Sequence, residues 1–166
     1  MKPPVSIRIN RRDFLASAGM LIADQSVGRK LHAQARPAGK ADHTLRIEPC
    51  SLEIGQGVTV KTIAYNGQVP GPILHLREGV PVTIDVTNAS ANADIVHWHG
   101  LAIDSLNDGA MEEGSPMIAA GETHRYTFTP KPAGTRWYHT HAGAGGDLGK
   151  GTYTGQFGFL LIEGSQ

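Results

Sequence analysis

The stretch "VTIDVT", residues 82–87, decides the fold class of this chain. Its valine and isoleucine side chains occupy every second position, and Thr83, Asp85 and Thr87 lie between them. Side chains that alternate in this way belong to a strand with one face in the core and the other in solvent. His124 to Thr129 repeats the alternation. The pattern therefore predicts a sheet with an apolar inner face.

The rest of the chain after Thr44 has the same organisation. Val58 to Tyr65 is rich in β-branched residues and runs into Asn66-Gly67, a dipeptide that tolerates the positive φ of tight turns. Phe157 to Ile162 is apolar on both faces, which predicts a strand buried between layers in the middle of the fold. Short strands, Gly- and Pro-rich turns and the lack of an amphipathic helical pattern predict an all-β Greek-key sandwich or barrel.

Size and charge narrow the function. The chain has 166 residues, of which 40% are hydrophobic, so a single packed core is expected. Lys plus Arg and Asp plus Glu number 15 each, so the chain lacks the excess of positive charge expected of a protein that binds nucleic acid or an anionic membrane.

Glycine-rich residues 142–155 are expected to form a long mobile loop.

The amino-terminal segment has the layout of an export signal. Basic residues precede the weakly apolar run Phe14 to Ala23, and Ala33-Gln34-Ala35 resembles a cleavage site. The apolar run is about half the length that a membrane-spanning helix needs, so no stable membrane span is expected. Arg11 to Leu15 resembles the twin-arginine pattern. We expect residues 1–35 to be a twin-arginine-type signal, and residues 36–166 to form a single domain in the periplasm.

Single cysteine and histidine residues are expected to be structural. Cys50 is the only cysteine, which excludes an internal disulfide and leaves a small buried hydrophobe, a thiolate ligand or an intermolecular bridge. His43, His75 and His124 are each expected to be core residues rather than ligands.

Two His-x-His pairs carry the chemistry. His97 and His99 flank Trp98, and His139 and His141 flank Thr140. On a strand the two histidines of each pair share one face, about 6 to 7 Å apart. If the two strands are neighbours, four imidazoles converge. Imidazole binds zinc, copper, iron and nickel, and affinity peaks at copper(II).

These residues resemble a known family. "HWHG" (97–100) followed by "WYHTH" (137–141) is similar to the amino-terminal cupredoxin domain of the multicopper oxidases, the family of laccases, bilirubin oxidases and cuprous oxidases. The resemblance extends to "YNGQVPGP" (65–72), to Val80–Asn88, to "AGTRWYH" (133–139) and to the strand Gly158–Glu163. It implies an all-β, Greek-key fold of the cupredoxin (plastocyanin-like) type.

The resemblance also implies roles in a three-copper cluster that reduces dioxygen. His97 would bind the type 2 copper, His99 and His139 one type 3 copper, and His141 the other. Asp108 matches the acidic residue that relays protons to the oxygen intermediates, although a turn role for its Asp-Gly sequence fits equally well.

The same resemblance implies that this chain requires a partner. In the family a second cupredoxin domain supplies the remaining histidines, and a Cys-His constellation near the carboxyl end of the last domain builds the type 1 copper that receives electrons from the reducing substrate. Cys50 lies upstream of both pairs and has no His neighbour. We therefore expect either an oxidase part that is active only with a second copper domain, or a non-enzymatic periplasmic copper-binding protein. The absence of a carboxyl-terminal Cys-His constellation argues against a small blue-copper electron carrier.

Overall fold

The computed structural model describes residues 39–143 and 151–164 of the chain. The predicted export signal, residues 1–35, lies outside the described residues, as do residues 144–150 of the predicted loop. The described residues form eight strands: β1 (His43–Gly55), β2 (Val58–Tyr65), β3 (Leu74–Arg77), β4 (Val82–Asn88), β5 (Val96–His99), β6 (Thr123–Phe128), β7 (Gly134–Thr140) and β8 (Phe157–Glu163). Three short helices lie in the connections: α2 (Ser105–Asp108), η1 (Met111–Glu113) and η2 (Gly151–Thr154). The all-β prediction is confirmed.

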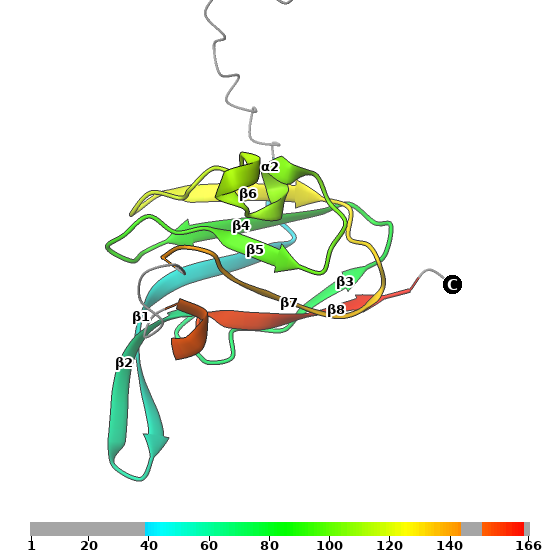
Figure 1. Ribbon diagram of the computed structural model, residues 1–166. Coiled ribbons are helices and arrows are strands. Elements are labelled where there is room, and N and C mark those ends of the chain that lie inside the picture. Colours follow the sequence, from blue (N-terminus) through cyan, green and yellow to red (C-terminus); the bar gives the residue numbers. More distant parts are fainter. Residues whose placement is uncertain (1–38, 144–150, 165–166) are drawn as a thin grey trace, which may run out of the picture. The chain divides into compact units, whose positions relative to one another are not determined.

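The strands form two four-stranded sheets (Figure 1). The first has the order β2-β1-β4-β6, and the second has the order β3-β8-β7-β5. Apart from the β1–β2 and β7–β8 connections, each connection takes the chain from one sheet to the other. Both sheets are mixed, because β1 pairs parallel with β4 and β3 pairs parallel with β8.

The alternation read from the sequence is the burial pattern of the strands. Val82, Ile84 and Val86 of β4 are buried, and the threonine and aspartate side chains between them are partly exposed. The buried apolar side chains of both sheets form one core cluster, which includes Leu45, Ile84, Trp98, Tyr126, Tyr138 and Leu160. The turn prediction is also confirmed, because Asn66 has a φ of 54° and Gly67 a φ of 67°.

The β1–β2 hairpin extends away from the other strands (Figure 1). Its outer half pairs Leu52 with Val60 beyond the last residues that pack in the core. Cys50 lies on this hairpin and is half-buried, so the expectation that it is a small buried hydrophobe is not confirmed. The reason is that β1 and β2 extend beyond the other strands of their sheet.

The prediction for Phe157–Ile162 was half correct. β8 lies between β3 and β7, as expected of a central strand. Its burial nevertheless alternates, and Phe159 and Leu161 are 39% and 41% exposed. A two-layer sandwich covers only one face of each sheet, so these two apolar side chains point outward. The outer face of β8 therefore presents exposed apolar side chains.

Candidate metal centre

The two His-x-His pairs lie on neighbouring strands. β5 and β7 pair antiparallel, and the register places His97 directly opposite His139 and Trp98 directly opposite Tyr138. Because neighbouring side chains on a strand point to opposite faces, the histidines occupy one face and the two aromatic residues occupy the other. Trp98 and Tyr138 are fully buried in the core. The condition for convergence of the imidazoles, that the two strands are neighbours, is therefore met.

Three imidazoles are arranged as a metal site. One ring nitrogen from each of His97, His99 and His139 lies within 4.8 Å of the others. Nδ1 of His99 is 3.3 Å from Nε2 of His139. Two nitrogens bound tetrahedrally to one ion at about 2.0–2.1 Å would be separated by about the same distance. These residues therefore fit a metal ion of the kind that imidazole prefers.

The fourth histidine lies against the other three. The His141 ring stacks on His97, with centroids 4.3 Å apart, and its centroid is 5.1 Å from that of His139. Its nitrogens do not belong to the convergent group of three. His141 is therefore a neighbour of the site that could serve a second ion.

Hydrogen bonds select the nitrogen that each ring can offer to a metal. Nδ1 of His97 is 2.7 Å from the backbone carbonyl oxygen of Asp108, and Nδ1 of His139 is 2.9 Å from that of Thr140. Because a carbonyl oxygen only accepts, each Nδ1 carries the proton and each Nε2 has a free lone pair. This arrangement is typical of metal-binding histidines, whose second nitrogen is held by a carbonyl or carboxylate.

Burial keeps two of the imidazoles neutral. The pKa of His139 is lowered to about 4, mainly by burial and also by the neighbouring histidines, while the hydrogen bond to the Thr140 carbonyl opposes this shift. The pKa of His141 is also lowered, first by burial and then by His97. A metal binds the neutral form of imidazole, so both rings are ready to bind at neutral pH without losing a proton.

Asp108 lies beside His97. Its carboxylate Oδ2 is 3.5 Å from Nδ1 of His97, in addition to the contact of its backbone carbonyl. The chain can approach β5 so closely because Gly109 follows, with a φ of 82°, where a Cβ would lie 2.6 Å from Cα of His97. Ser115 secures this turn by accepting from the Gly109 N–H at 2.8 Å. The sequence pointed to Asp108, but not to the roles of Gly109 and Ser115.

Three other histidines of the described residues, His43, His75 and His124, lie outside the convergent group. His75 is exposed, and His43 and His124 are half-buried, so the expectation that these three belong to the core was wrong. His43 opens β1, and His124 and His75 lie on β6 and β3. Neither His-x-His pair includes them, so the expectation that they are not part of the cluster remains consistent with the structure.

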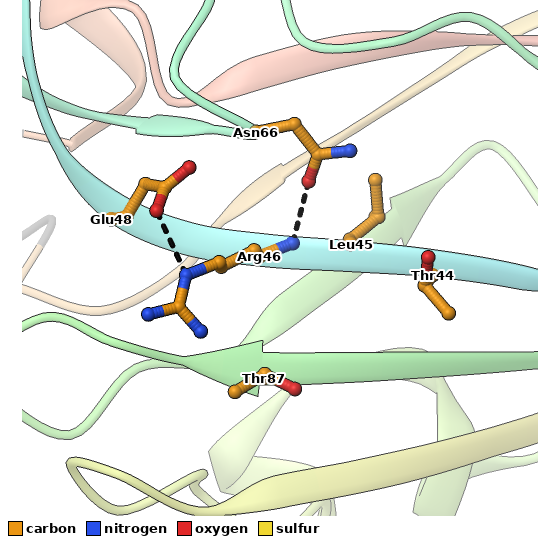
Figure 2. Close-up of a pocket in the computed structure, with 6 residues that line it drawn as sticks. All are labelled: Thr44, Leu45, Arg46, Glu48, Asn66 and Thr87. Atoms are coloured by element: carbon orange, nitrogen blue, oxygen red, sulfur yellow. Dashed lines mark hydrogen bonds and ion pairs between the residues drawn. The ribbon is translucent and has the colours of Figure 1, made fainter.

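A pocket of about 380 Å³ lies elsewhere, along β1 and β4 (Figure 2). Arg46 crosses it, and its guanidinium donates to Glu48 at 2.8 Å while Asn66 accepts from its backbone N–H at 2.7 Å. These groups already satisfy each other, and the strands belong to the sheet that does not carry the His-x-His pairs. The pocket therefore contributes nothing to the metal centre.

Comparisons with known proteins show the family of the chain. A model of the multicopper oxidase family matches residues 46–166. Multicopper oxidase MmcO of Mycobacterium tuberculosis is 35% identical over 106 residues, 64% of this chain and 21% of that protein. Copper resistance protein A of Escherichia coli is 40% identical over 83 residues, 50% of this chain and 13% of that protein. This chain thus spans about a fifth or less of the length of these relatives.

Solved structures of multicopper oxidases have a fold similar to that of this chain. The blue copper oxidase of Nitrosomonas europaea matches with a TM-score of 0.66 and 34% identity, over 75% of this chain and 39% of that one. This similarity confirms the predicted cupredoxin type of the Greek-key sandwich. Among the described residues, no helix is long and apolar enough to cross a bilayer.

Proposed function

The chain belongs to the multicopper oxidase family, whose members use copper, and from this premise we propose that it supplies half of a trinuclear copper cluster. The observation that carries the proposal is the convergence of His97, His99 and His139 on one face of a cupredoxin sheet. When bound, copper would supply the chemistry of dioxygen reduction coupled to the oxidation of a substrate. The residues of this chain would bind the metal and hold its ligands in place.

We propose that each histidine has one role. His99 and His139 would share one type 3 copper, which the 3.3 Å separation of their nitrogens supports. His97 would bind the type 2 copper through Nε2, because the Asp108 carbonyl occupies its Nδ1. His141, outside the convergent group, would bind the second type 3 copper.

We propose that Asp108 holds and releases a proton beside His97. Its carboxylate is 3.5 Å from His97 Nδ1 and is kept there by the turn at Gly109. A carboxylate in this place can accept a proton from solvent and release it toward the cluster, which general acid–base chemistry requires.

A second cupredoxin domain is the proposed partner. Phe159 and Leu161 of β8 are 39% and 41% exposed, and Ile73, which immediately precedes β3, is 57% exposed. Both β3 and β8 belong to the sheet that carries the histidines. An apolar surface beside incompletely surrounded metal ligands is expected to be covered by protein. The second domain would add the missing histidines and the type 1 copper, where an external reductant would deliver its electrons.

We propose that residues 1–35 are a twin-arginine-type export signal and that the domain, residues 36–166, is periplasmic. The twin-arginine system generally carries folded proteins, so copper could be acquired before or after export.

The alternative function is non-enzymatic copper binding in the periplasm. It is favoured by the fact that three nitrogens of this chain alone lie within 4.8 Å, close enough to hold one ion without a partner. In that case the four histidines would store the metal or pass it to another protein.

Oxygen uptake separates the two functions. The copper-loaded domain is mixed with a cuprous or phenolic substrate, alone and with a second copper domain that carries His-x-His and His-Cys-His motifs, such as one encoded beside it. We expect no uptake alone and uptake with the partner. Leu161→Glu should abolish uptake by preventing docking and leave copper binding unchanged.

Two outcomes oppose the proposal. Activity of the isolated domain would contradict both functions, because one half-cluster would then be sufficient. Tight copper binding that never supports uptake with a competent partner would favour the non-enzymatic alternative.

A further inference from the structure

A buried carboxylate lies immediately before the first ligand strand. Asp94 is 6% exposed and precedes β5 by two residues. Its Oδ1 accepts from the hydroxyl of Thr140 at 2.6 Å and from the backbone N–H of Ile95 at 2.7 Å. Its Oδ2 accepts from the side-chain amide of Gln156 at 2.6 Å. A buried carboxylate is costly unless its oxygens are satisfied, and here three donors satisfy them.

The three donors connect the strands that build the metal centre. Ile95 leads into β5, Thr140 is the last residue of β7, and Gln156 immediately precedes β8. Thr140 and Gln156 are each only 3% exposed. Asp94 therefore ties together three adjacent strand ends on the core side of the histidine face.

Thr140 connects this carboxylate to the ligands. It lies between His139 and His141, and its side chain points away from the histidine face. Its hydroxyl donates to Asp94 and accepts from the backbone N–H of Ala142 at 2.9 Å. Its carbonyl accepts from Nδ1 of His139 at 2.9 Å. The backbone on both sides of His141 is thus held by one residue.

We propose that Asp94 is a positioning residue for the metal centre, which acts through Thr140 to fix the spacing of His139 and His141 and the tautomer of His139. The inference rests on the proposed function, because it assumes that these histidines bind copper. The inference goes beyond the proposed function, because it assigns a role to a side chain that touches none of the four imidazoles. Asp94 contacts Thr140, and Thr140 in turn contacts the ligand His139.

The hydrogen-bond arrangement predicts which substitutions matter. Asp94→Ala would leave the Thr140 hydroxyl and the Gln156 amide without their acceptor in a buried site. Thr140→Val would keep the volume of the side chain and break the same connection. Asp94→Asn and Thr140→Ser should rescue, because an amide oxygen can accept from Thr140 while Gln156 rotates, and serine retains the hydroxyl.

The experiment combines copper titration with imidazole NMR on the metal-free protein. We expect Asp94→Ala and Thr140→Val to weaken copper(II) binding by at least about tenfold, the effect typical of residues that orient metal ligands. The proton on Nδ1 of His139 should be lost or shared between both nitrogens in these variants. Asp94→Asn and Thr140→Ser should behave like the original protein in both measurements.

A matched control separates positioning from stability. Asp85 is a carboxylate of the other sheet and is paired with Arg125 at 2.6 Å. Asp85→Ala should lower the free energy of unfolding and leave copper affinity unchanged. If Asp94→Ala and Thr140→Val bind copper as tightly as the original protein and keep the His139 tautomer, the positioning role is excluded, however much stability they lose.

The NMR measurement keeps this inference distinct from the proposed function. If the original protein binds no copper at its histidines, the proposed function fails. The tautomer of His139 in the metal-free variants would still confirm or contradict the influence of Asp94.

Discussion

Replacement of His139 by Ala is expected to remove copper from the domain and leave the sheet intact. His139 contributes one of the three convergent nitrogens, and its Nε2 lies 3.3 Å from Nδ1 of His99, the proposed co-ligand. Loss of a direct ligand should weaken binding by more than the roughly 10–100-fold typical of residues that only orient ligands. Copper content after dialysis and isothermal titration measure the effect, and circular dichroism reports the sheet.

His75→Ala is the matched control for this experiment. His75 is an exposed histidine on β3, in the same sheet but outside the convergent group, so its removal should leave copper content unchanged. A His139→Ala protein that is unfolded yet binds copper fully would require the ligand assignment to be abandoned.

Replacement of Trp98 by Ala is expected to have the opposite effect, a loss of stability rather than a direct loss of ligands. The Trp98 ring is fully buried and lies 5.2 Å from both Tyr126 and Phe128, measured between ring centroids. Truncation of a buried tryptophan costs about 3–5 kcal/mol, because it removes apolar contacts and leaves a cavity. Urea unfolding of the metal-free domain measures the change.

Two further variants test why Trp98 matters. Its indole N–H is buried without a hydrogen-bond partner among the described residues, so Trp98→Phe loses no hydrogen bond and should cost much less. Trp137→Ala deletes the same ring from the outer face, where Trp137 is only partly buried, and should also cost less. Equal stability of Trp98→Ala and the original protein would mean that Trp98 does not anchor the core.

The strands and the histidine cluster could be predicted from the sequence because both depend on local periodicity. Successive side chains of a strand point to opposite faces, so His97 and His99 share one face and Trp98 lies on the other, independently of the rest of the chain. The family resemblance supplied the adjacency of the two pairs, which the register of His97 opposite His139 confirms.

The supporting residues could not be predicted, because their contacts connect distant parts of the chain. Asp94 and Gln156 are 62 positions apart and bond only when β5 and β8 are brought to the same end of one sheet. The exposed face of β8 was missed for a related reason. An apolar strand has the same sequence whether another layer of this chain or a separate domain covers it.

Anomalous X-ray diffraction at the copper edge, on crystals of the copper-loaded domain, measures the position of the metal itself. We expect copper peaks within bonding distance of Nε2 of His97, of Nδ1 of His99 and Nε2 of His139, and of His141. Copper located only at Cys50, at His75 or elsewhere on the surface, with the four imidazoles left free, would contradict the account.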